Sequence, residues 1–79
     1  MSPTVFRWRG YRFYFFSREE ERMHVHVYCA DGEAKFWLEP EIGLAYNHGI
    51  RQSEIASIRR VIEEHRDEIA RAWHAHFRR

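Results

Sequence analysis

The chain has 79 residues, which is enough for one small domain spanning residues 1–79, and 44% of them are hydrophobic, which excludes intrinsic disorder. Thirteen basic and twelve acidic residues give a net charge of +1, which excludes binding of nucleic acid or membranes through bulk charge alone. One cysteine excludes an internal disulfide, and the absence of an apolar run of about 20 residues excludes a membrane span or signal peptide, so we expect a cytoplasmic protein.

The first predicted element is a hairpin of residues 4–8 and 11–16, which are rich in aromatic and β-branched residues and are separated by Arg9-Gly10. Strand alternation divides it into two faces. The expected inward residues are Phe6, Trp8, Phe13 and Phe15, and the expected outward residues are Val5, Arg7, Arg12, Tyr14 and Phe16. A slip of one residue would exchange these faces.

A charged loop over residues 17–22 leads to a second hairpin, whose strands are predicted at residues 24–29 and 33–38 with the turn at Asp31-Gly32. Met23, Val25 and Val27 alternate with polar residues, and Ala34, Phe36 and Leu38 do so on the next strand. The other face of this hairpin therefore carries His24, His26, Tyr28, Lys35, Trp37 and Glu39. The candidate site consists of His24, His26, Tyr28, Lys35 and Trp37 from this hairpin, with Arg7, Arg12 and Tyr14 from the first hairpin.

Pro40 ends the fourth strand, since its ring removes a ladder donor. Residues 42–46 fit either a short fifth strand or an ordered loop, and Asn47 and Gly49 fit positions of positive φ. All strands are thus expected within residues 4–46.

One long helix is predicted over about residues 54–77, with Ser53 as its N-cap. Its apolar positions recur at steps of three and four, at Ile55, Ile58, Val61, Ile62, Ile69, Trp73 and Phe77. With one helix available, parallel crossovers are excluded. We therefore expect an α+β fold, an antiparallel four- or five-stranded meander sheet with the helix packed on one face. The expected core is Phe6, Trp8, Phe13, Phe15, Val25, Val27, Phe36, Leu38, Ile55, Ile58, Ile62 and Ile69.

Several segments together resemble small bacterial proteins of domain-of-unknown-function family 4160. They are Thr4-Val5-Phe6, Ser17-Arg18-Glu19-Glu20, His24-Val25-His26-Val27, the block from Asp31 to Pro40, and the terminal helix. Many family members have one or two prolines before the first histidine, where this chain has Glu21, Arg22 and Met23. The resemblance implies no assigned activity. It implies a neighbouring gene for a second small protein, of domain-of-unknown-function family 2442, in an arrangement similar to toxin and antitoxin modules.

The candidate site has three interpretations. His24 and His26 lie about 7 Å apart along a strand and could share a metal, but no third ligand is secured, so no metal site or cofactor is expected. The two histidines could instead act as general acid and base on RNA, with Arg7, Arg12, Tyr14, Tyr28, Lys35 and Trp37 as the binding surface.

The third interpretation makes the same face a protein interface, because tyrosine, tryptophan and arginine are enriched at interface hot spots. We favour it, and expect a non-enzymatic interaction component of a two-gene module. The expected partner is a small cognate protein of the family 2442 type or a second copy of the chain, with RNA as the alternative partner and no membrane association.

Overall fold

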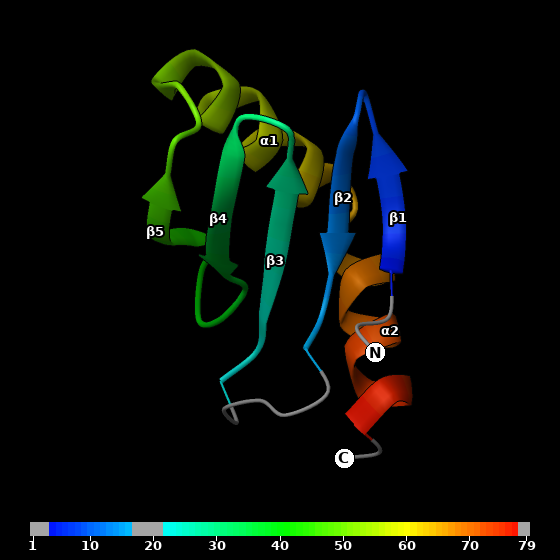
Figure 1. Ribbon diagram of the computed structural model, residues 1–79. Coiled ribbons are helices and arrows are strands. Elements are labelled where there is room, and N and C mark those ends of the chain that lie inside the picture. The colour runs from blue at the N-terminus through cyan, green and yellow to red at the C-terminus, as the bar shows by residue number, and fades with distance from the viewer. Residues whose placement is uncertain (1–3, 17–21, 78–79) are drawn as a thin grey trace.

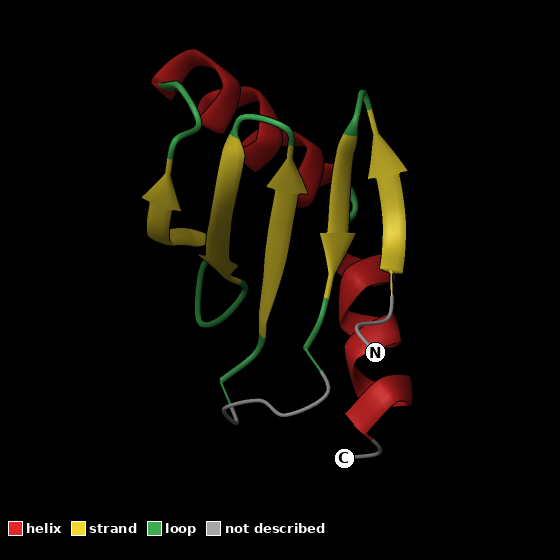
Figure 2. Cartoon of the chain, viewed as in Figure 1, coloured by secondary structure: helices red, strands yellow, loops and turns green. Residues whose placement is uncertain are grey.

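The computed structural model describes residues 4–16 and 22–77, which form one antiparallel sheet and two helices (Figures 1 and 2). The strands are β1 (Thr4–Trp8), β2 (Tyr11–Tyr14), β3 (His24–Cys29), β4 (Gly32–Trp37) and β5 (Gly43–His48), in the spatial order β1-β2-β3-β4-β5. The helices are α1 (Gln52–Glu64) and α2 (Arg66–Phe77). The α+β meander is confirmed, and β5 excludes the alternative of a loop over residues 42–46. Of the predicted loop over residues 17–22, only Arg22 lies within the described residues.

The first hairpin has the predicted faces except at Val5. Arg9 and Gly10 both have positive φ, 49° and 82°, as a two-residue type I′ turn requires. Phe13 and Phe15 are buried, while Phe6 and Trp8 are half-buried against the core. Val5 was expected to face outward, but it packs against the core because the β1–β2 register shifts between Thr4 and Phe6.

The second hairpin turns one residue earlier than predicted. Cys29 pairs with Gly32, so the turn residues are Ala30 and Asp31, and Gly32 is already the first residue of β4. Glycine is required at this position for a different reason. A Cβ atom there would lie 2.0 Å from the carbonyl oxygen of His48, so only a residue without a side chain lets the end of β5 approach.

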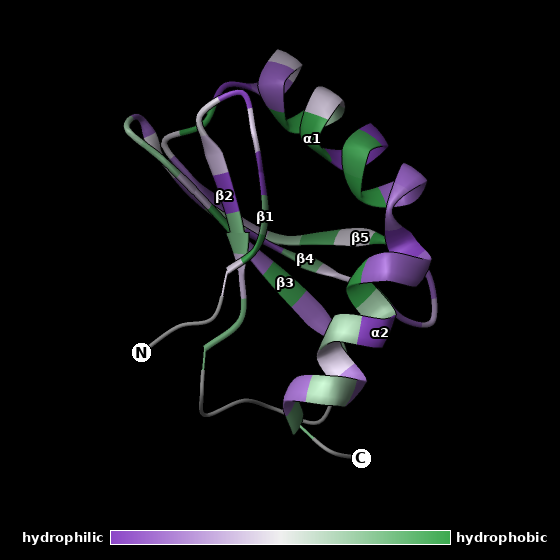
Figure 3. Cartoon of the chain, turned by 90° about the vertical axis from the view of Figure 1, so that its right-hand side faces the viewer, coloured by the Kyte–Doolittle hydropathy of each residue, from purple (hydrophilic) through white to green (hydrophobic). Residues whose placement is uncertain are grey.

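The predicted single helix is divided at His65, and both parts lie on the same face of the sheet (Figure 3). A straight helix of about 25 residues would run for roughly 37 Å, beyond the 34 Å longest extent of the whole molecule. The change of direction lets Ile69 and Trp73 of α2 stay buried against the sheet. None of the helices in the described part of the chain is long and apolar enough to cross a membrane.

The predicted N-cap is wrong. The helix begins at Gln52, and Arg51 occupies the N-cap with no side-chain capping bond. The carbonyl of Arg51 accepts hydrogen bonds from the amides of Glu54 and Ile55, both at 3.0 Å. Ser53 therefore lies in the first turn.

The loop before α1 differs from the prediction at one of two positions. Gly49 has the expected positive φ, 94°, but Asn47 does not adopt one. Its side chain instead holds the loop: Oδ1 accepts from the amide of Ile50 at 3.0 Å, and Nδ2 donates to the carbonyl of Ile50 at 2.6 Å. The Asn47 side chain thus fixes the chain where it leaves the sheet for α1.

The core lies between the sheet and the two helices. Ten of the twelve predicted core residues are buried, and Phe6 and Trp8 are half-buried. Buried residues that the prediction left out are Tyr11, Met23, Ala34, Ile50, Val61 and Trp73. Two helix arginines also tie the β4–β5 connection to the helices, because Arg66 donates to the carbonyl of Leu38 at 3.1 Å and Arg59 to that of Ile42 at 2.8 Å.

Candidate functional site

The sheet face opposite the helices, called the outer face below, carries every residue of the predicted site. The register brings them together in cross-strand pairs, since directly opposed residues of antiparallel strands share a face. The pairs are Arg7 with Arg12, Arg12 with Tyr28, Tyr14 with His26, His26 with Lys35, and His24 with Trp37. Tyr46 and His48 of β5 extend the face, paired with Lys35 and Glu33. Both described helices, α1 and α2, lie on the opposite face of the sheet (Figure 3).

The centre of the outer face is buried, which alternation along the strands did not predict. His24 is fully buried and His26 is 4% exposed, and Tyr14 is also buried. The His26 ring lies 4.3 Å from that of Phe16 and 5.4 Å from that of Tyr14, centroid to centroid. The two histidine rings meet edge to face at 5.0 Å.

His24 lies where the sheet opens. Strands β2 and β3 pair only as far as Tyr14 and His26, so no β2 residue faces His24. Trp73 of α2 approaches its ring at 5.1 Å, and Trp37 lies at 5.7 Å. The Nδ1 atom of His24 lies 2.8 Å from the carbonyl oxygen of Arg22 and must carry the proton, because a carbonyl only accepts. His24 therefore connects the helix side of the molecule to the outer face.

The burial of both rings limits their chemistry. The Nε2 atoms of His24 and His26 are not exposed to solvent, whereas a general base must come within hydrogen-bond reach of its substrate. Across residues 4–16 and 22–77, no group of three or more His, Cys, Asp or Glu side chains comes together in a way that could hold a metal ion.

Cations lie over several aromatic rings of the outer face. The guanidinium of Arg12 lies 4.7 Å from the centroid of the Tyr14 ring. Trp37 has two such neighbours, the guanidinium of Arg22 at 4.1 Å and the ammonium of Lys35 at 4.4 Å. Stacking of this kind orients both partners. The rim is more open, since Phe16 is 42% and Tyr28 is 51% exposed.

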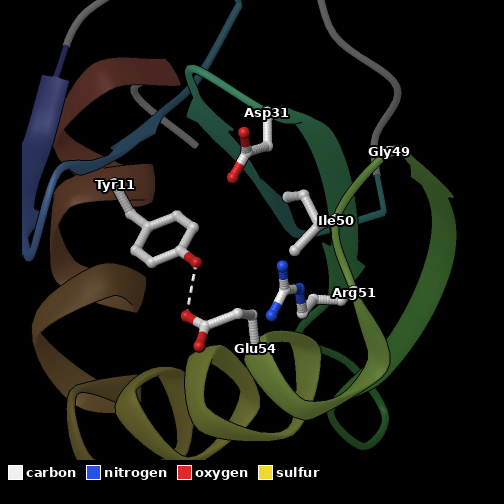
Figure 4. Close-up of a pocket in the computed structure, with 6 residues that line it drawn as sticks. All are labelled: Tyr11, Asp31, Gly49, Ile50, Arg51 and Glu54. Atoms are coloured by element: carbon white, nitrogen blue, oxygen red, sulfur yellow. Dashed lines mark hydrogen bonds between the residues drawn. The ribbon is translucent and has the colours of Figure 1, made fainter.

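A separate pocket of about 540 Å³ lies at the start of α1 (Figure 4). It is lined by Tyr11, Asp31, Gly49, Ile50, Arg51 and Glu54. Tyr11 donates a hydrogen bond to Oε1 of Glu54 at 2.5 Å. This bond, followed by desolvation, raises the pKa of Tyr11 to about 12. No sequence pattern predicts this pocket, because its residues come from the start of β2, the β3–β4 turn and the segment from the end of β5 into α1, with no common spacing.

The described geometry defines a small α+β domain with helices on one sheet face and an aromatic and cationic surface on the other. The family described as "Domain of unknown function (DUF4160)" matches residues 10–74, and the chain belongs to this family. Neither the curated proteins nor the solved structures include a match to this chain.

Proposed function

We propose that the chain is a protein-interaction component of a small two-gene module of the toxin and antitoxin kind, and that it binds its partner protein with the outer face. The observation that supports this is the open, aromatic sheet face. Helices cover one side of the sheet only, and Phe16, Tyr28 and Arg7 are exposed on the other. Exposed aromatic surface of this composition is typical of interfaces. The two-gene part follows from the gene arrangement that the family resemblance implies.

The buried centre of the outer face supports an interface more than a catalytic site. A recognition surface gains from side chains that are already ordered, because less conformational entropy is lost on binding. Stacking among Tyr14, His24 and His26 provides that order. The alternative of RNA cleavage by His24 and His26 needs an open approach to their rings, and the burial of both gives it less support.

The expected partner is a small protein of the domain-of-unknown-function family 2442 type, or a second copy of this chain. Light scattering after gel filtration tests for the second copy. Co-expression with the product of the neighbouring gene, followed by titration of the purified proteins, tests for the cognate partner. If the chain stays monomeric and does not bind the neighbouring gene's product, the proposal fails.

The matched variants are Tyr28→Ala on the outer face and His74→Ala on α2, both of which change exposed positions. Truncating an aromatic side chain inside an interface costs about 1.4 kcal/mol or more, which is about tenfold in affinity. We expect that loss for Tyr28→Ala and none for His74→Ala. Equal affinities for both variants would place the interface elsewhere.

A further inference from the structure

We infer that the segment of the partner protein that contacts the outer face is acidic. This inference rests on the proposed function and names the chemistry of its partner. It is carried by the distribution of charge over the molecule and by three geometric features of the outer face.

The two sides of the domain differ in charge. Among the described residues, the outer face carries Arg7, Arg12 and Lys35, with the Arg22 guanidinium over Trp37, against Glu33 and, at the end of the sheet, Glu39. Residues 52–77, which form the two helices, contain four arginines and five acidic residues. Over the described residues, the sheet face is therefore cationic and the helical side is nearly neutral. A complementary partner surface for that face is negative.

Two arginines lie on neighbouring strands at one end of the outer face. Arg7 and Arg12 are directly opposed in the β1–β2 register, and Arg12 is oriented by a hydrogen bond from its Nε to Oγ1 of Thr4 at 2.7 Å and by the ring of Tyr14. A carboxylate of a bound partner at this end of the face would meet two positive charges from adjacent strands.

A second pair of cations shares one ring. Arg22 and Lys35 both lie over Trp37, at 4.1 and 4.4 Å from the ring centroid, which places two positive charges around one ring of the face. Arg22 is anchored further by a hydrogen bond from Nε to the carbonyl of Glu39 at 2.9 Å. The outer face thus carries two pairs of cations, each beside an aromatic ring.

These features favour an acidic protein segment over RNA. Sequence-independent RNA binding uses open aromatic platforms on which bases stack and many phosphate contacts. Here the rings of Tyr14 and Trp37 are already stacked with cations, and Tyr14 is buried. An extended protein segment needs no open ring. Alternate carboxylates along such a segment would all face the sheet.

The test uses a fluorescein-labelled ten-residue peptide of alternating Glu and Tyr, a matched peptide of alternating Lys and Tyr, and a single-stranded RNA of uridines. Fluorescence anisotropy measures the affinity of the full chain for each. We expect the acidic peptide to bind about tenfold more tightly than the basic one, and its affinity to fall steeply between about 0.05 M and 0.5 M salt. Tighter binding of the RNA, or equal binding of the two peptides, would overturn the inference.

The variants are Arg7→Glu on the outer face and Arg60→Glu on α1, which make the same charge change at two exposed positions. We expect Arg7→Glu to weaken binding of the acidic peptide about fivefold or more, and Arg60→Glu to change it less than about twofold. Arg7→Gln, which removes the charge without reversing it, gives an intermediate loss. Equal losses for Arg7→Glu and Arg60→Glu would show only a net-charge effect and would refute the assignment to this face.

Failure of this inference is distinguishable from failure of the proposed function. If Tyr28→Ala weakens binding of the cognate protein but Arg7→Glu and salt do not, the outer face is the interface and its partner segment is not acidic. If the acidic peptide binds as expected while neither the neighbouring gene's product nor a second copy does, the chemistry of the surface stands and the two-gene role fails.

Discussion

Gly32→Ala should destabilise the protein more than any other glycine substitution compared below. Gly32 begins β4 at the point where the end of β5 passes closest. The new Cβ would lie 2.0 Å from the carbonyl oxygen of His48 and 3.0 Å from two backbone carbon atoms of Gly49. All three atoms belong to the backbone, so no side-chain rotation relieves the contact. The β4–β5 pairing of Glu33 with His48, one residue away, must shift instead.

The expected loss in the free energy of unfolding is large because backbone atoms, not side-chain atoms, must move. Overpacking that forces backbone shifts costs about 1–3 kcal/mol, and a contact this short with backbone on both sides belongs at about 3 kcal/mol. For a domain of this size that corresponds to a fall in Tm of about 12–24 °C. Two other glycines distinguish steric overlap with the backbone from conformational strain as the cause of the lost stability. Gly10 has φ of 82° but open space around it, so Gly10→Ala carries only conformational strain of about 1–2 kcal/mol.

Gly43 is the matched control, because it lies in a strand, has no positive φ and has nothing within 4 Å of an added Cβ. Gly43→Ala should change stability by less than about 1 kcal/mol. Urea unfolding followed by far-ultraviolet circular dichroism gives the free energy of unfolding for all three variants. If Gly32→Ala loses no more stability than Gly10→Ala, the close approach of β5 to β4 described above is wrong.

Four further substitutions test single side chains, and three of them, His24→Ala, Tyr11→Phe and Asn47→Ala, use the same urea assay. His24→Ala should cost about 3 kcal/mol or more, because it empties a fully buried ring site, whereas loss of an exposed histidine would cost less than about 0.5 kcal/mol. Tyr11→Phe should flatten the pH dependence of stability. The pKa of Tyr11 in the folded protein, about 12, lies above its ordinary value of 10.0, so the stability that the protonated hydroxyl contributes is present below pH 10.0 and is lost as the pH rises toward 12. Glu54→Gln should lower that pKa, measured by ultraviolet titration. Asn47→Ala should cost about 1–2 kcal/mol and speed amide exchange of Ile50, while unchanged exchange would refute the role of its side chain.

Alternation and turn residues were sufficient to predict the first four strands of the sheet, whereas the fifth was left open between a strand and a loop. The aromatic strands of the first hairpin and the Val25 and Val27 pattern fixed which residues face the helices, and Arg9-Gly10 marked a turn that needs positive φ twice. Asp31-Gly32 correctly indicated the second hairpin, but Gly32 pairs with Cys29 and is not one of the two turn residues. This glycine is needed because β5 passes close by, which is a contact between residues distant in sequence that no local pattern contains.

The helix shows a similar limit of local patterns. Apolar positions continue at helical spacing through His65, so periodicity alone predicts one helix. The division at His65 lets α2 pack against the sheet. Trp73 stays buried, with its ring 5.3 Å from that of Phe15 and 5.1 Å from that of His24. Ser53 fits an N-cap by type, yet the Asn47 side chain shapes the preceding loop and the helix begins at Gln52. Packing against the sheet thus accounts for the division at His65, while a local side-chain interaction shapes the loop before the start of α1.

For the candidate site, alternation correctly grouped the residues on one face but did not predict their exposure. A residue on an open sheet face is still buried when neighbouring strands diverge and larger side chains close over it, as they do at His24. The pocket beside Tyr11 lay beyond prediction because it is assembled from separate segments of the chain. Which residues share a sheet face depends on local strand geometry, whereas the burial of each residue depends on packing between segments that are distant in sequence.

The buried histidine and the cationic surface are connected through one residue. His24 donates from Nδ1 to the carbonyl of Arg22, and the guanidinium of Arg22 lies over Trp37, whose ring packs against His24 in turn. A phenylalanine could fill the same space but could not bond that carbonyl, which explains a histidine in an aromatic environment without invoking catalysis. On this view His24 acts by fixing the backbone before β3, and so holds one cation of the outer face in the place where a partner's carboxylate would meet it.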